Sequence, residues 1–218
     1  AAVTCTSVTK EQKKEQPPKL YDLTTLQREA NRLFGYTAKQ TLDYAQSLYE
    51  KKLLTYPRTD SRYLTSDMAE TASCVIHLAA KLPPFDCCSN FFPLVEAMIS
   101  DRDVSDHHAI IPTEQFVQLD HMTIDERRIY DLVVRRFLAV LYPSCEYEQT
   151  AVEATAAGEH FYASGNHMVK MGWRAVYEGM NSSDEEEEET AVSSEHFPEF
   201  HVGQKLSGAA FAITEGKT

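Results

Sequence analysis

Tyr56 and Arg58 are the two side chains of this sequence whose types and spacing best suit covalent chemistry. The intervening Pro57 steers Tyr56 away from helical dihedrals and toward an extended backbone. In an extended segment, side chains two residues apart point to the same side, so the phenol and the guanidinium would face one target. Tyrosine can act as a nucleophile, and the planar fork of arginine matches phosphate oxygens. The pair is suited to attack on a phosphodiester, although by their chemistry alone the residues fit a buried Tyr56 with Arg58 paired to Asp60 better.

The net charge of the chain at first argues against a nucleic-acid partner. The formal charge is -12 at pH 7 over 218 residues, whereas phosphate-binding proteins normally show a basic excess. Half of this imbalance lies in the acidic run from Asp184 to Glu189. Basic residues gather instead in and before the tyrosine segment: Arg28, Arg32, Lys39, Lys51, Lys52, Arg58 and Arg62. Because a local field decides where a polyanion docks, a nucleic-acid partner stays compatible with the sequence.

Neither a membrane protein nor a disulfide-stabilised secreted protein fits the sequence. No apolar run approaches the roughly 18 residues of a membrane span, and the N-terminus lacks a signal-peptide pattern. The five cysteines are odd in number and include no C-x-x-C pair, which disfavours both a disulfide framework and a zinc site. We therefore expect a cytoplasmic protein without membrane contact.

Helical periodicity covers the middle of the chain, and strand periodicity covers its two ends. Apolar spacing and capping residues predict helices from Thr24 to Phe34, from Ala38 to about Glu50, from Thr65 or Ser66 to about Leu82, from Leu94 to Ser100, and from Ile124 up to Pro143. Alternation predicts strands at residues 1–9, 147–156, 158–171 and 204–211, with a linker or domain boundary at 10–19. The predicted fold is α+β: a mainly helical domain (21–145) inserted into a β domain (1–20 and 146–218) that carries an acidic loop at 182–195. The order of helix, turn and strand before Tyr56 makes the helical domain winged-helix-like.

Four stretches, in the same order, resemble type IA DNA topoisomerases, and most of all their bacterial topoisomerase III branch. They are Leu54 to Ser61 with Gln46 and Tyr49 upstream, His107 to Thr113 with the pattern His-x-Ala-Ile-x-Pro, Pro17 to Gln27, and the acidic run followed by Phe197-Pro198 and Val202 to Leu206. The resemblance spans nearly the whole chain. It implies that the β domain is part of a β-barrel-like domain on which the helical domain hinges.

The resemblance also implies a covalent mechanism. Tyr56 would attack a phosphodiester of single-stranded DNA and hold the 5′ phosphate while a free 3′ hydroxyl departs, which conserves the bond for rejoining without a nucleotide. Arg58 would neutralise charge on the pentavalent phosphate. His107 would hydrogen-bond the phosphate or the DNA backbone near the scissile bond, and it matches the family's histidine better than its neighbour His108.

Four further residues are expected to contact DNA. Gln46 and Tyr49 match helix positions that face the DNA strand in the family. Tyr49 would stack on a base, a contact worth roughly 1 to 3 kcal/mol, or else pack as an aromatic on an apolar stripe. Thr59 and Ser61 would contact phosphate or sugar.

No metal or cofactor site is expected within the chain. In the family, the acidic Mg²⁺ ligands of an Asp-x-Asp pattern belong to a separate N-terminal domain, together with a glutamate and a lysine; Asp101-Arg102-Asp103 has this spacing but lies in the helical region. The resemblance thus implies a fragment of an ATP-independent topoisomerase that acts by strand passage and uses Mg²⁺ in its full-length form. Its partners would be single-stranded DNA and the remaining domains of the same polypeptide. Alone, the fragment is expected to be inactive.

Two other function classes make different predictions. A non-enzymatic winged-helix module would carry a basic recognition helix, which the sequence does not show. A tyrosine recombinase would carry several arginines and histidines before a C-terminal tyrosine, whereas here Tyr56 comes early and His107 follows it.

Overall fold

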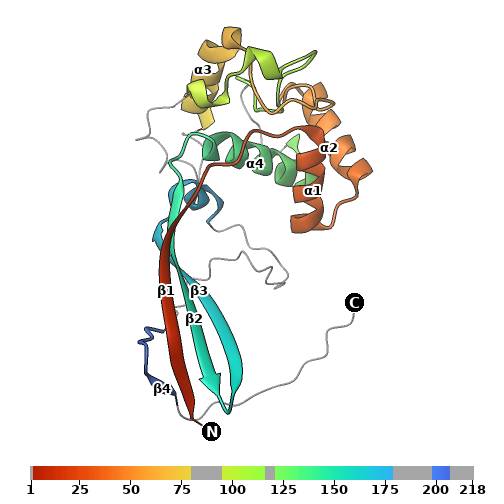
Figure 1. Ribbon diagram of the computed structural model, residues 1–218. Coiled ribbons are helices and arrows are strands. Elements are labelled where there is room, and N and C mark those ends of the chain that lie inside the picture. Colours follow the sequence, from red (N-terminus) through yellow and green to blue (C-terminus); the bar gives the residue numbers. More distant parts are fainter. Residues whose placement is uncertain (1, 80–94, 116–120, 179–197, 207–218) are drawn as a thin grey trace. The chain divides into compact units, whose positions relative to one another are not determined.

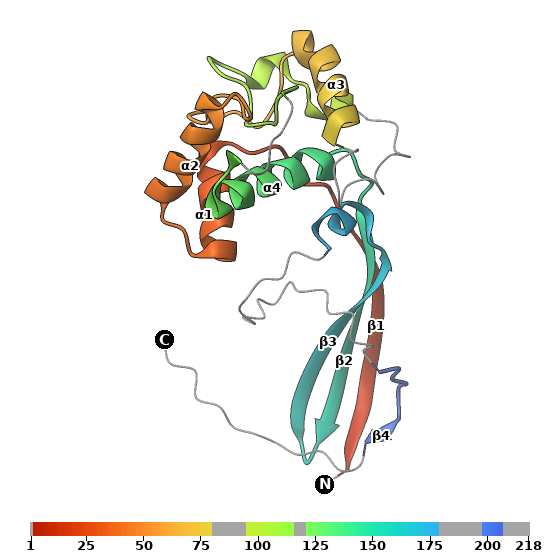
Figure 2. The same ribbon diagram turned by 180° about the vertical axis from the view of Figure 1, so that it is seen from behind.

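The structure is a computed structural model that describes residues 2–79, 95–115, 121–178 and 198–206. The chain divides into two compact units. A strand unit comprises residues 1–15, 146–171 and 187–218, and a helical unit comprises residues 16–145 and 172–186 (Figures 1 and 2). The fold is therefore α+β, as predicted, whereas the winged-helix and barrel descriptions stay predictions. The predicted acidic loop at 182–195 lies outside the described residues.

The strand unit contains a four-stranded sheet with the order β3-β2-β1-β4. Its strands are β1 (Val3–Glu15), β2 (Cys145–Ala156), β3 (Glu159–Lys170) and β4 (Lys205–Leu206). β2 and β3 form an antiparallel hairpin, which confirms the two strands predicted there. The turn residues Ala157 and Gly158 both have positive φ, 53° and 89°, which suits the twist of a tight hairpin. β4 pairs antiparallel with the start of β1.

The stretch at residues 10–19 is not a linker in its first half, because β1 continues to Glu15. The division between the two units falls within it, after Glu15. Lys10 and Lys14 pair with Glu148 and Glu146 of β2, with nitrogen to oxygen distances of 3.1 and 3.0 Å. Opposite charges on adjacent strands stabilise a sheet even where the sequence is polar. The polar composition therefore reflects an exposed sheet face and not a linker.

The helical unit contains the helices α1 (Leu23–Phe34), α2 (Ala38–Glu50), α3 (Ala69–Ala79) and α4 (Ile124–Ala139). Thr37 caps α2 and Thr123 caps α4, each in a reciprocal capping box. α1 begins one residue earlier than predicted, because the cap is the Asp22 carboxylate, which accepts a hydrogen bond from the Thr25 N–H. The predicted helix before α3 opens as a 3₁₀ turn (Ser66–Met68), and its predicted end beyond residue 79 lies outside the described residues. The helix predicted at 94–100 is a 3₁₀ turn, Val95–Met98.

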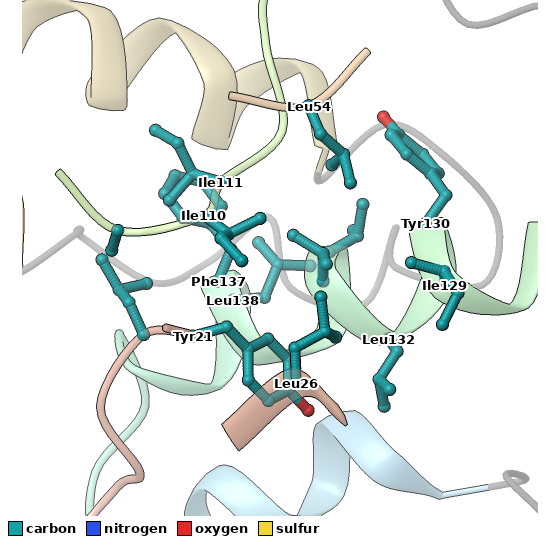
Figure 3. Close-up of a cluster of buried hydrophobic side chains, with 14 of the residues drawn as sticks. Tyr21, Leu26, Leu54, Ile110, Ile111, Ile129, Tyr130, Leu132, Phe137 and Leu138 are labelled. Carbon is teal, nitrogen blue, oxygen red and sulfur yellow. The ribbon is translucent and has the colours of Figure 1, made fainter. Parts of the chain in front are cut away.

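α4 runs through the middle of the helical unit and contacts α1, α2 and α3 (Figures 1 and 2). The apolar stripe predicted for this helix is buried in full: Ile129, Leu132, Val133, Phe137, Val140 and Leu141. Figure 3 shows Leu54, Ile110 and Ile111, which come from segments without regular structure, gathered with residues of α4 in one core. The central helix therefore provides the surface against which the tyrosine segment packs.

After the strand predicted at 158–171, Trp173 lies in a 3₁₀ helix, Gly172–Tyr177. Gly172 ends the strand because its φ is +52° and a Cβ there would lie 2.5 Å from the carbonyl oxygen of Ser144. The Trp173 N–H donates to the carbonyl of Pro143 at 3.0 Å, and the Trp173 ring meets the Tyr177 ring edge to face. Trp173 therefore packs in the helical unit, in agreement with a structural role.

Candidate active site

The tyrosine segment is held by a second segment, residues 109–113, through backbone hydrogen bonds. The Thr55 N–H donates to Ile111 O at 3.0 Å, and the Thr113 N–H donates to Leu53 O at 3.1 Å. The Thr55 hydroxyl forms two further hydrogen bonds with this segment: it donates to Ala109 O at 3.1 Å and accepts from the Ile111 N–H at 3.0 Å. Because Leu53 and Ile111 are also buried, the backbone that leads to Tyr56 is fixed by both packing and hydrogen bonds.

Side chains alternate between core and solvent along residues 57–61. Pro57, Thr59 and Ser61 are buried, whereas Arg58 and Asp60 are exposed, and Tyr56 is half-buried. This is the period of two that an extended segment produces. The alternation supports the expectation that Tyr56 and Arg58 share one side of the segment.

His107 lies against Tyr56. The two ring centroids are 4.4 Å apart, with an angle of 47° between the ring planes. The Thr59 hydroxyl donates to the carbonyl oxygen of His107 at 2.9 Å, so the tyrosine segment itself positions the histidine. The neighbouring His108 instead places its Nδ1 2.9 Å from Ala109 O, which requires a proton on Nδ1. The structure therefore brings His107, and not His108, to the ring of Tyr56.

Arg58 keeps its guanidinium available. It is exposed and forms no hydrogen bond or ion pair with any residue that the structure describes. Asp60 is exposed as well, and the pairing of Arg58 with Asp60 that the sequence allowed is not seen. The Tyr56 hydroxyl likewise has no hydrogen-bond partner among the described residues. Both polar groups are thus free to meet a ligand.

Tyr49 and Gln46 lie on α2, next to the tyrosine. The ring of Tyr49 meets that of Tyr56 edge to face, with centroids 5.5 Å apart, and 39% of Tyr49 is exposed. Gln46 donates to the Glu50 carboxylate on the same helix at 3.2 Å. Tyr49 therefore both packs against the candidate nucleophile and leaves part of its ring open to a base.

Thr59 and Ser61 face the core, with exposed fractions of 7% and 4%. The Thr59 oxygen accepts from the Ser61 N–H at 3.1 Å besides donating to His107. The Ser61 hydroxyl lies 3.0 Å from Asp103 O and 3.3 Å from Tyr63 O. This burial favours a positioning role for both residues over the direct DNA contact that the sequence predicted.

An ion pair between Arg62 and Asp22 ties the far end of the tyrosine segment to α1. Arg62 Nε donates to Asp22 Oδ2 at 2.7 Å, and the Leu23 N–H donates to Thr59 O at 3.0 Å. Burial alone would raise the pKa of Asp22, but the hydrogen bonds from Thr25 and Arg62 outweigh it and lower the pKa. From the sequence, Arg62 is recognisable only as local positive charge, because nothing in the spacing reveals a partner forty residues away.

Glu126 anchors the near end of the segment. Its carboxylate, in a residue only 4% exposed, accepts from Lys51 Nζ at 2.7 and 2.8 Å, from the Ser47 hydroxyl at 2.6 Å and from the Thr123 N–H at 2.8 Å. Burial would raise the pKa of Glu126, but these hydrogen bonds, the one from Lys51 first, lower it to about 2. The capping box predicted the bond to Thr123, whereas the contact with Lys51 depends on the tertiary packing of α2 on α4.

Within residues 2–79, 95–115, 121–178 and 198–206, no three His, Cys, Asp or Glu side chains come together as a metal site would require. These residues therefore do not fit the Mg²⁺ site that the resemblance implies for a full-length enzyme. In the same described ranges, none of the helices has the length and apolar character needed to span a bilayer.

Comparison with known proteins identifies the family. The family model described as DNA topoisomerase matches residues 1–218. The chain is 43% identical to DNA topoisomerase 3 of Bacillus cereus over 99% of its own length and 30% of that protein. It is 42% identical to DNA topoisomerase 3 of Bacillus subtilis, over 94% of the chain and 29% of that protein. The chain thus spans about 30% of the length of the curated relatives it matches.

A solved structure is similar in fold. Full-length topoisomerase I from Thermotoga maritima matches 94% of this chain and 32% of its own chain, with a TM-score of 0.64 and 23% sequence identity. At that identity the match supports the fold alone. The family model and the relatives lead to one conclusion: the chain belongs to the DNA topoisomerase family, in the type IA, bacterial topoisomerase III branch that its motifs resemble.

Proposed function

We propose that the chain carries the nucleophile of a topoisomerase that cleaves and rejoins single-stranded DNA through a 5′-phosphotyrosyl link. Tyr56 is the nucleophile, and Arg58 and His107 contact the phosphate. The observation that carries the proposal is the placement of the His107 ring against that of Tyr56, with the centroids 4.4 Å apart. Two residues after Tyr56, the exposed Arg58 has no partner among the described residues. The relatives named DNA topoisomerase 3 support the same activity.

The reaction exchanges one phosphoester for another. The phenolic oxygen of Tyr56 bonds to phosphorus, the bond from phosphorus to the 3′ oxygen breaks, the phenol loses a proton and the 3′ oxygen gains one. Arg58 is suited to the charge on the pentavalent phosphate, because its fork can place two donors on the equatorial oxygens. The 3′ hydroxyl later attacks the phosphotyrosine and restores the strand, so no nucleotide is consumed.

The DNA strand would run past α2. Tyr49 offers part of its ring for stacking beside Tyr56, and Gln46, three residues earlier on the helix, lies on neighbouring surface. Thr59 and Ser61 act in this proposal mainly by holding His107 and the backbone. The winged-helix and barrel character of the two units, and the hinge between them, belong to the same proposal.

Groups outside this chain complete the reaction. We assign the Mg²⁺ that the family resemblance implies to another part of the full-length polypeptide, which we also count as a partner of this chain. The chain alone would bind single-stranded DNA weakly and would not relax supercoiled DNA. Robust relaxation of supercoiled DNA by these 218 residues alone would contradict the proposal that groups outside this chain are required.

The proposal is tested by trapping the covalent adduct. The full-length protein is incubated with a labelled single-stranded oligonucleotide, denatured and run on a gel. The unmodified protein should give a DNA-linked band, and Tyr56→Phe should give none, because only the phenolic oxygen is removed. Tyr49→Phe, on the neighbouring ring, is the matched control and should keep the band. A DNA-linked band in Tyr56→Phe would reject Tyr56 as the nucleophile.

A further inference from the structure

A cavity of about 200 Å³ lies in the helical unit beside the continuation of the tyrosine segment. Its floor is apolar and buried and consists of Leu20, Met98 and Val140. Its remaining wall includes the half-buried ring of Tyr63 and the side chains of Lys19 and Arg62. An apolar floor with an aromatic ring and two cations is a combination that an unpaired nucleotide can use.

A residue outside the cavity orients one of the two cations. Arg62 is oriented by the bond from its Nε to the Asp22 carboxylate at 2.7 Å. Lys19 Nζ lies 4.8 Å from the centroid of the Tyr63 ring, and the carbonyl of Lys19 accepts a hydrogen bond from Arg136 Nη1 at 3.2 Å. Arg62 is therefore oriented before any ligand binds, which lowers the entropy lost on binding, whereas the exposed Lys19 side chain can still move toward a phosphate.

Donors on the rim remain unused. The bond to Asp22 occupies Nε of Arg62, and its terminal nitrogens have no partner among the residues that the structure describes. The hydroxyl of Tyr63 has no described partner either. Arginine offers five N–H donors, so Arg62 can keep Asp22 and still bind a phosphate oxygen.

The cavity is connected to the candidate active site through the backbone. The carbonyl of Tyr63 accepts from the Ala109 N–H at 2.9 Å, and the N–H of Tyr63 donates to the Ser61 hydroxyl at 3.2 Å. Tyr63 is seven residues after Tyr56 in the sequence, so the two lie at most about 25 Å apart even in a fully extended chain. One DNA strand of a few nucleotides can therefore reach both.

We propose that this cavity binds one nucleotide of the single strand, with its base on the Tyr63 ring and its phosphate between Lys19 and Arg62. The proposal rests on the proposed function and adds a second point of contact some nucleotides from the scissile bond. On binding, the base takes the place of the Lys19 ammonium over the ring, and the ammonium moves to the phosphate. A paired base cannot enter, because its face is covered by its neighbours in the stack.

The test measures binding of this chain to a fluorescein-labelled single-stranded oligonucleotide by anisotropy. Tyr63→Ala should weaken binding about tenfold, the range expected for the loss of one stacked base. Tyr63→Phe keeps the ring and should bind nearly as the unmodified chain does. Lys19→Gln should lower the slope of log affinity against log salt by about 0.7, the value for one phosphate contact on a single strand. Lys13→Gln, a surface lysine paired with Glu11 on β1, is the matched control and should change little.

A second measurement places the nucleotide without relying on the folding of a variant. An abasic site is moved along the oligonucleotide one position at a time. For the unmodified chain, an abasic site should weaken binding at the position that stacks on Tyr49 and at one further position. Tyr63→Ala should remove only the effect at that further position. Circular dichroism confirms that each variant is folded.

Three results would overturn the subsite: no abasic position whose effect depends on Tyr63, unchanged binding in folded Tyr63→Ala and Lys19→Gln, or equal affinity for duplex and single strand. These failures are distinct from failure of the proposed function. An adduct that forms on Tyr56 while the abasic scan shows no dependence on Tyr63 would reject the subsite alone. Loss of the subsite signal cannot by itself remove the phosphotyrosyl band.

Discussion

The two faces of the tyrosine segment have opposite relations to the rest of the molecule. Thr59 and Ser61 point inward and use their hydroxyls on backbone atoms of the neighbouring segments. Tyr56 and Arg58 point outward, and their polar ends have no partner among the described residues. The inward face thus supplies stability and position, while the outward face keeps reactive groups unsatisfied. Mutations on the two faces should therefore separate stability from activity.

The largest effect is expected on the outward face. Arg58→Ala in the full-length protein should slow DNA cleavage about 100-fold or more, because one charge-stabilising donor is lost at the phosphate. Its unfolding free energy should change by no more than about 0.5 kcal/mol, since the side chain is exposed and unpaired among described residues. Adduct formation over time and thermal melting measure the two quantities. Asp60→Asn, on the same side and equally exposed, is the control, and an equal loss there would refute a specific role for Arg58.

Glu126 tests the anchor that precedes the segment. The pKa of Glu126 is about 2 in the folded protein, below the ordinary 4.5, so the folded state binds its proton less readily. Its stabilisation, about 3 kcal/mol at most, is complete above pH 4.5 and is lost as the pH falls from 4.5 toward 2. Glu126→Gln should lower stability at pH 7 and flatten this acid-side decline.

Denaturant unfolding at pH 7, 4.5 and 3 measures the effect of Glu126→Gln. Asp22 also has a lowered pKa, so it too makes the stability fall at acid pH. The pH dependence of Glu126→Gln is therefore compared with that of the unmodified chain, and some loss of stability at acid pH is expected in both. Glu50→Gln replaces an exposed glutamate at the end of α2 and is the control. If the unfolding free energies of Glu126→Gln and of the unmodified chain change with pH in parallel, the lowered pKa of Glu126 does not stabilise the fold.

The inward face is tested with Thr59→Val. The substitution keeps the shape but leaves the carbonyl of His107 and the N–H of Ser61 without their partner, which should cost about 1 to 3 kcal/mol of unfolding free energy. Thr59→Ser retains the hydroxyl and should recover most of that loss. If Thr59→Val instead abolishes DNA binding at unchanged stability, the residue contacts DNA directly, as the sequence first predicted.

The sequence predicted well what depends on local pattern. The buried stripe of α4, the hairpin of β2 and β3, and the capping box at Thr123 follow from periodicity and short-range hydrogen bonding. The extended backbone that Pro57 predicts at Tyr56 agrees with the alternating burial of residues 57–61. Periodicity could not separate the polar strand β1 from a linker, because both are polar and only pairing with β2 distinguishes them.

Contacts between distant segments could not be predicted in the same way. Only tertiary packing brings Lys51 to Glu126 and Arg62 to Asp22. The sequence contains many other charge pairs that are equally plausible. The inward orientation of Thr59 and Ser61 was missed for a related reason. Their hydroxyls suit phosphate and backbone carbonyls equally, and the alternation that assigns them to the core face depends on the packing of Leu53 and Ile111.

The smallest effect concerns Tyr49, for which the sequence left stacking and packing open. Its ring meets that of Tyr56 edge to face at 5.5 Å and is 39% exposed, so both contributions are compatible with the geometry. Tyr49→Leu should weaken oligonucleotide binding about fivefold, the lower end of a stacking contact, while stability falls by less than about 1 kcal/mol. Tyr49→Phe should behave as the unmodified chain. If Tyr49→Leu loses stability without losing affinity, Tyr49 supports the structure as Thr59 and Ser61 do. Tyr56 is then the first residue, in chain order, whose side chain serves DNA contact.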